Sequence, residues 1–82
     1  MTESEIRQQL RTWIVNRAKD KPDGFRDDIP ILESGILSSL DIVELILFIE
    51  NLRGGVEVSV EDLDSGAFRD VDAIYRSFFV PA

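Results

Sequence analysis

The sequence predicts an all-α fold, a small four-helix bundle with three main helices, a short third helix and a long first loop. Apolar residues recur at helical spacing in three segments, and a residue suited to capping precedes each of them. Only one short stretch alternates like a strand. With 82 residues, the chain is expected to form a single domain over residues 1–82.

The first predicted helix covers about residues 3–18. Thr2 and Glu5 have the spacing of a capping box, in which each side chain binds the backbone N–H of the other residue. The apolar positions of this segment recur at helical spacing and are expected to face the core: Ile6, Leu10, Trp13 and Ile14.

A long loop is predicted from residue 19 to residue 38. Pro22-Asp23-Gly24 is a turn signal, and Pro30 disfavours helix at the residue before it. Loops of this length are usually functional or ordered by their own packing. Six apolar residues are expected to pin this one to the core: Phe25, Ile29, Ile31, Leu32, Ile36 and Leu37.

The second helix, at about residues 39–53, is the clearest element. Ser38 is suited to cap it, Asp41 places a negative charge in its first turn, and Gly54-Gly55 ends it. At 100° per residue, one face should be the core stripe: Ile42, Leu45, Ile46 and Ile49.

The opposite face of this helix mixes apolar side chains with carboxylates: Leu40, Val43, Glu44, Leu47, Glu50 and Asn51. Two readings are open at this point. A small bundle can wrap apolar residues on two sides of a helix, or the face is an apolar patch rimmed by charge that binds a partner.

The last third of the chain is expected to hold an extended connector at residues 56–60 and a short helical turn at 61–66. Asp70 then has the position of an N-cap for a final helix at about 71–79, and Phe68 should anchor the connection. The buried stripe of this helix is expected to be Val71, Ile74, Tyr75 and Phe78.

The composition excludes several classes of function. The chain has no Cys and no His, which removes thiol and imidazole catalysis and the usual transition-metal ligands. Its net charge of −7 argues against binding nucleic acid. No signal peptide or membrane-spanning run is visible, so a cytoplasmic monomer without membrane association is expected.

The charge is uneven along the chain. Residues 1–26 carry a net charge of +2, and residues 27–82 carry −9. This asymmetry either serves solubility or attracts a partner with a basic surface.

Few residues are suited to catalysis, and the protein is not expected to be an enzyme. Asp27-Asp28 either binds a divalent cation weakly or lies in a solvated loop, and Glu61 opens an ordinary acidic helix start. A small regulatory enzyme using these carboxylates is a minor alternative.

Ser39 differs, because a hydroxyl at a helix N-terminus suits a phosphate or phosphodiester. It is either a simple helix-start residue or the target of another enzyme.

The segment Glu33-Ser34-Gly35-Ile36-Leu37-Ser38-Ser39-Leu40-Asp41-Ile42-Val43-Glu44-Leu45 resembles the phosphopantetheine attachment region of acyl carrier proteins, which typically read Gly-x-x-Asp-Ser-Leu. The resemblance continues at Gly55-Val56-Glu57-Val58 and at Phe68-x-x-Val71, and it spans about Ile6 to Phe78. It implies an acyl-carrier-like fold.

By position, the resemblance implies that Ser39 takes 4′-phosphopantetheine from coenzyme A, in a reaction made by a separate Mg-dependent phosphopantetheinyl transferase. The arm would then carry an acyl or aminoacyl group as a thioester. An acyl- or aminoacyl-loading ligase and downstream transferases or synthases, all with basic surfaces, would read a docking face: Leu40, Asp41, Val43, Glu44, Leu47 and Glu50.

Two departures from the family pattern matter. Ser38 stands where the family has an Asp that helps recruit the transferase and its metal, and Leu52-Arg53-Gly54-Gly55 replaces the usual Phe-Gly end of the helix. The first departure supports an alternative, an unmodified carrier-like adaptor that binds basic partners through its acidic second helix. The approach Gly35-Ile36-Leu37 resembles that of carriers for amino acids or specialised acyl chains.

Overall fold

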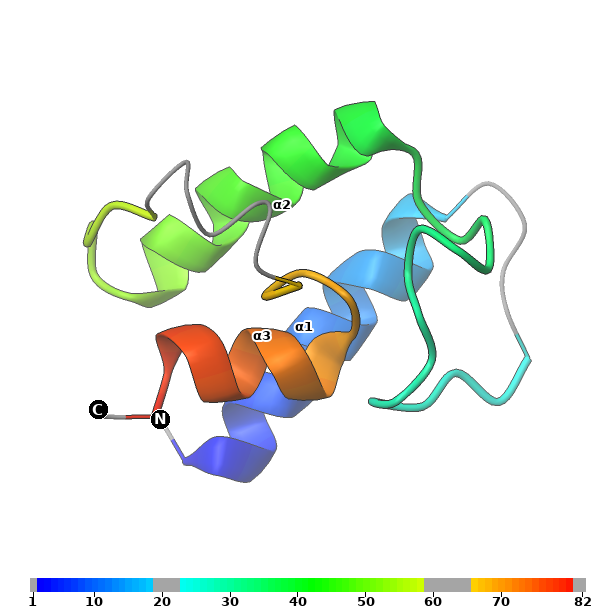
Figure 1. Cartoon of the computed structure of the whole chain (residues 1–82). Coiled ribbons are helices and arrows are strands. Elements are labelled where there is room, and N and C mark those ends of the chain that lie inside the picture. Colours follow the sequence, from blue (N-terminus) through cyan, green and yellow to red (C-terminus); the bar gives the residue numbers. More distant parts are fainter. Residues whose placement is uncertain (1, 19–22, 59–65, 81–82) are drawn as a thin grey trace.

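A computed structural model describes residues 2–18, 23–58 and 66–80 of the chain. These residues form three helices, α1 (Glu3–Arg17), α2 (Ser39–Leu52) and α3 (Val71–Phe78), as Figure 1 shows. The described residues include no strand, and residues 56–58 have no regular secondary structure. The short helix expected at 61–66 falls on residues 61–65, which lie outside the described part. The fold class is therefore all-α, with the three main helices confirmed.

Local capping sets the helix starts, as expected. The N–H of Glu5 donates to Oγ1 of Thr2 over 3.2 Å, and the Glu5 carboxylate accepts from the N–H of Thr2. At α3, Oδ1 of Asp70 accepts from the N–H of Ala73 over 2.7 Å. Each bond satisfies a backbone donor that the first helical turn leaves without a partner. The end of α2 is also as predicted, because Gly54 and Gly55 have φ values of +72° and +92°, which glycine adopts without strain.

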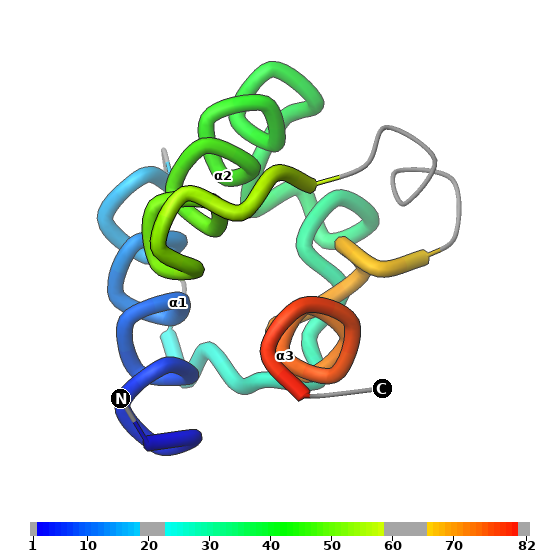
Figure 2. Tube along the Cα trace, turned by 90° about the vertical axis from the view of Figure 1, so that its left-hand side faces the viewer, coloured from blue at the N-terminus to red at the C-terminus, as the bar shows by residue number. Residues whose placement is uncertain are grey.

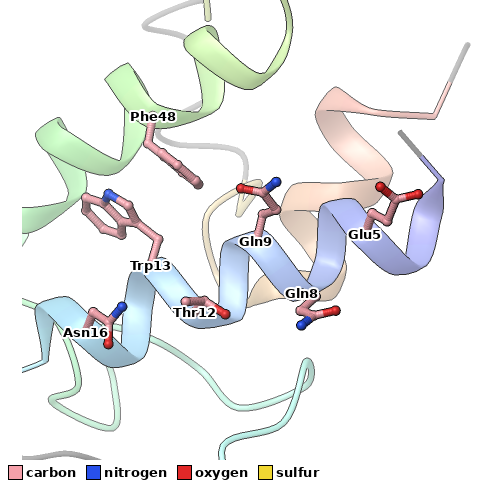
Figure 3. A pocket seen from close by; sticks show the side chains of 7 residues that line it. All are labelled: Glu5, Gln8, Gln9, Thr12, Trp13, Asn16 and Phe48. Atoms are coloured by element: carbon pink, nitrogen blue, oxygen red, sulfur yellow. The ribbon is translucent and has the colours of Figure 1, made fainter.

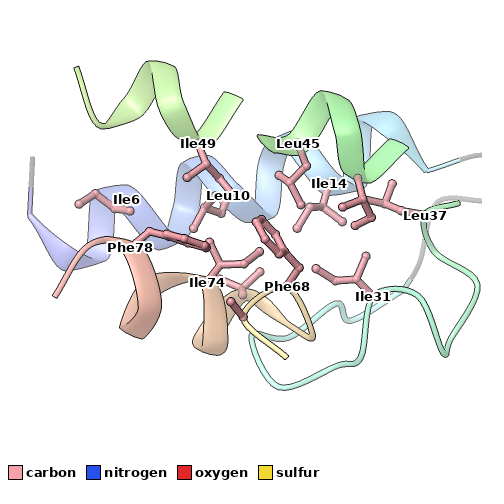
Figure 4. Packing of buried hydrophobic residues seen from close by; sticks show 13 residues of the cluster. Ile6, Leu10, Ile14, Ile31, Leu37, Leu45, Ile49, Phe68, Ile74 and Phe78 are labelled. Carbon is pink, nitrogen blue, oxygen red and sulfur yellow. The ribbon is translucent and has the colours of Figure 1, made fainter. Parts of the chain in front are cut away.

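The three helices and the loop surround a single core. α1 packs against both α2 and α3, and Figure 2 shows the loop running from beside α1, past α3, toward α2. Side chains from every element meet between them (Figure 4). The buried apolar residues of this cluster are Ile6, Leu10, Ile14, Ile31, Leu37, Ile42, Leu45, Ile49, Ala67, Phe68, Val71, Ile74 and Phe78.

Four core assignments need correction. Trp13, expected to face the core, is half-buried. Ile46 and Tyr75 are half-buried, because each lies at the edge of its helical stripe, about 60–70° from the centre. Leu32 was expected to pin the loop, but 48% of it is exposed, since the turn at 31–35 directs it outward. Ile31 and Leu37 hold the loop instead, at 0% and 3% exposure.

Backbone and side-chain contacts fasten the loop to the helices. The N–H of Ile31 donates to the carbonyl of Arg69 over 2.7 Å, and the N–H of Asp72 donates to the carbonyl of Asp27 over 3.0 Å. The guanidinium of Arg7 lies 2.9 Å from carboxylate oxygens of both Asp27 and Asp72, and Arg11 lies 2.7 Å from Asp27. One arginine of α1 thus joins the loop to α3.

These contacts correct the expectation of a solvated Asp27-Asp28 pair. Burial alone would raise the pKa of Asp27, but the hydrogen bonds from Arg11 and Arg7 outweigh it and lower that pKa below its ordinary value. Asp27 is therefore a charged structural group. Asp28 fits the expectation, because among the described residues it pairs with Arg26 and both side chains are 75% exposed.

Candidate functional site

Ser39 is the first residue of α2, and it is exposed. The preceding Ser38 is the N-cap. Its Oγ accepts from the N–H of Asp41 over 3.3 Å, and its own N–H donates to Oδ2 of Asp41 over 3.0 Å. Ser38 is therefore occupied as a structural cap. The Ser39 hydroxyl makes no hydrogen bond within the described residues, and neither do the first-turn N–H groups of Ser39 and Leu40. These polar groups are therefore open to a ligand.

A single arginine of α1 neutralises part of the acidic surface beside this helix start. Nε of Arg17 lies 3.1 Å from Oδ1 of Asp41, and its Nη2 pairs with Glu44. The N–H of Ser38, followed by the guanidinium of Arg17, lowers the pKa of the Asp41 carboxyl below its ordinary value. Asp41 thus stays ionised at neutral pH while it is held by both groups.

The outward face predicted for α2 is exposed along its apolar positions. The exposed fractions are 79% for Leu40, 58% for Val43 and 62% for Leu47. These three residues, called here the apolar stripe, run from the first turn of α2 toward its third. Isolated exposed leucines are ordinary, but these three side chains follow one another at spacings of three and four residues, which places them on the same side of α2 as neighbours.

Glu50 does not share this exposure. It is half-buried, and its Oε2 accepts from the N–H of Val58 over 2.9 Å. The carboxylate closes the turn that follows α2, so part of its charge serves the fold. Glu50, which was expected to contact partners, therefore also has a structural role in the turn after α2.

Two concave surfaces flank α2 on the side of α1. A cavity of about 520 Å³ adjoins the helix start and is lined by Arg17, Gly35, Ile36, Leu37, Ser38 and Asp41. A shallow groove of about 480 Å³ lies further along, where Trp13 and Phe48 stack with ring centroids 5.6 Å apart (Figure 3). Ser39 lines neither of them, so its hydroxyl opens to solvent on another side of the helix.

The described residues contain no group of three or more acidic side chains placed to hold a metal ion. None of their helices has the length and apolarity required to cross a membrane.

The sequence pattern did not predict the contacts of the α2 carboxylates with Arg17 and with the Val58 N–H. The contrast between a basic N-terminal third and an acidic remainder was the available signal for the first. That contrast alone is equally consistent with solubility or with a basic partner, and it does not specify pairing within the chain. No pattern in the sequence signals the second, because it depends on how the turn after α2 folds back.

No protein-family model matches this chain, and no curated protein matches it.

Proposed function

We propose that this protein is a carrier protein of the acyl-carrier type, which holds an acyl or aminoacyl group as a thioester on 4′-phosphopantetheine attached to Oγ of Ser39. The observation that supports this most is the division of labour between adjacent serines. Ser38 caps α2, whereas Ser39 presents an exposed hydroxyl at the same helix start. The short third helix, the acyl-carrier arrangement of the bundle and a cytoplasmic location belong to this proposal.

In this proposal, the Ser39 hydroxyl is the nucleophile of the attachment reaction that the resemblance implies. Ser39 Oγ attacks a phosphorus of the coenzyme A diphosphate, the new serine–phosphate bond forms, and adenosine 3′,5′-bisphosphate leaves. The serine proton passes to a base of the transferase, because the chain has no His to accept it. The N–H groups of Ser39 and Leu40, which have no partner among the described residues, and the positive end of the α2 dipole favour the phosphodiester product.

The partners in this proposal are a phosphopantetheinyl transferase, a loading ligase, and downstream transferases or synthases. They would contact the apolar stripe beside Ser39, together with Asp41, Glu44 and Glu50 at its edges. The protein contributes no catalytic residue of its own. It presents the arm and is recognised by the enzymes that act on it.

Intact-mass measurement tests the proposal directly. The protein is incubated with coenzyme A, Mg²⁺ and a broad-specificity transferase, and the mass of one phosphopantetheine group is expected to be added. Ser39→Ala should remain unmodified, and Ser38→Ala, the matched control, should still be modified. Addition retained in Ser39→Ala would refute the assignment.

The replacement of the family Asp by Ser38 favours one alternative, an unmodified adaptor that binds basic partners through α2. In that case the wild-type protein gains no mass, and partner capture is the same for wild type and Ser39→Ala. Native protein isolated with the arm attached would reject the adaptor.

A further inference from the structure

Arg17, the last residue of α1, contacts both acidic residues in the first two turns of α2. Its side chain is 45% exposed, and those of Asp41 and Glu44 are 25% and 46% exposed. One positive charge therefore faces two negative charges at the protein surface. All three groups are accessible to a partner that approaches α2.

The position of this ion-pair cluster on the helix separates it from Ser39. At about 100° per residue, Asp41 and Glu44 lie about 200° and 140° around the axis from Ser39. The apolar stripe lies at about 40–100°, between Ser39 on one side and the two carboxylates on the other. Arg17 thus borders the stripe along the edge away from the hydroxyl, and it can affect docking without touching the attachment site.

We propose that Arg17 is an internal counter-cation of the docking face, which a basic side chain of a partner must displace to reach Asp41 and Glu44. This inference rests on the proposed function, in which α2 is recognised by basic enzymes. With Arg17 in place, the two carboxylates and the guanidinium sum to −1, so an incoming cation gains less than the carboxylates alone would offer. Arg17 thereby lowers the affinity for any basic surface and favours partners that also cover the apolar stripe.

The displacement is energetically accessible. Exposed ion pairs change an equilibrium constant by about five-fold at most, and salt weakens them further. A partner that supplies a cation in the same place recovers that interaction. The arrangement therefore sets a threshold for docking and does not block it.

Steady-state kinetics of Ser39 modification by the transferase test this role. Arg17→Gln removes the charge and Arg17→Lys keeps it. Arg26→Gln is the matched control, because it removes one charge from an exposed pair with Asp28 in the loop. At low ionic strength, Arg17→Gln is expected to lower KM about two- to five-fold with kcat unchanged. The gain should disappear at high salt, and the other two variants should match the wild type.

An unchanged or raised KM for Arg17→Gln, relative to Arg26→Gln, would overturn the proposal. Circular dichroism checks that the variants are folded, and Arg17→Met, which keeps the aliphatic stem, replaces the glutamine variant if helicity falls.

A second measurement does not depend on the attachment chemistry. Oligolysine is titrated into the unmodified proteins, and the amide NMR shifts of α2 report binding. Arg17→Gln should bind oligolysine more tightly than the wild type and Arg26→Gln. Equal binding by all three would refute the role of Arg17. If Ser39 of the wild type is never modified, the proposed function fails, and the oligolysine comparison alone decides whether Arg17 shields the carboxylates.

Discussion

Replacing Arg7 by Ala should be among the most damaging changes to an ionic residue of this protein. The guanidinium lies 2.9 Å from Asp27 and from Asp72, and 4.7 Å from the centre of the Tyr75 ring. Because the Arg7 side chain is only 18% exposed, these contacts are partly shielded from water. Each of the two ion pairs is expected to contribute about 1 kcal/mol, and the ring contact about 0.5 kcal/mol. With the Glu3 pair on the same helix, the loss should reach about 3 kcal/mol.

The assay is urea unfolding followed by circular dichroism and by the fluorescence of Trp13, the single tryptophan. A loss of this size should also lower Tm by about 12–24 °C in a domain of this length. The matched control is Arg26→Ala, which removes the same charge from an exposed pair with Asp28 and should cost less than about 0.5 kcal/mol. If Arg7→Ala falls within that range of the control, Arg7 does not join the loop and α3 to α1 energetically.

Three further predictions concern the core, the cap of α2 and acid stability. Ile49→Ala should cost about 3 kcal/mol in urea unfolding and Ile46→Ala about 1 kcal/mol, because Ile49 is 0% exposed and Ile46 is half-buried. Equal costs would mean that α2 is rotated. Ser38→Ala should cost about 1 kcal/mol of thermal stability and Ser38→Asp almost nothing, since Asp also caps helices; equal losses would contradict the capping role. The lowered pKa of Asp27 stabilises the fold fully above its ordinary value of 3.8, and this contribution is lost as the pH falls through the lowered folded value. Asp27→Asn should therefore show a flatter decline of the urea midpoint below about pH 4, and an unchanged decline would refute this.

The parts of the fold that depend on neighbouring residues were predictable from the sequence. The capping box of Thr2 and Glu5, the caps Ser38 and Asp70, and the glycine end of α2 all formed as expected. Each depends on residues within about four positions of one another, where the helix geometry itself brings the groups together. For the same reason, the helix bounds differ from the prediction by no more than about a residue at each end.

The ionic contacts could not be predicted in this way. Arg7 and Asp72 are 65 positions apart, and Arg17 and Asp41 are 24 positions apart. Whether they meet depends on how α1 lies against α2 and α3, which the hydrophobic pattern of each segment does not specify. The sequence displayed the opposite charges of the two regions without indicating which residues pair. The exposure of Leu32 has a similar origin, because the turn around it and not its hydrophobicity decides its direction.

This pairing changes what the acidity of the chain implies for docking. Asp27, Asp41, Glu44 and Asp72 each pair with an arginine of α1, and the three arginines involved offset three of the nine net negative charges carried after residue 26. In the proposed function, a partner that approaches α2 meets the apolar stripe with partly neutralised carboxylates along one edge. Burial of that stripe should supply most of the affinity, because it involves large exposed side chains without an internal partner to displace. Charge should then act mainly on the association rate and on the choice among partners. The number of carboxylates in the sequence therefore overstates the salt dependence expected of docking, and Arg17 is the residue that accounts for the difference at the start of α2.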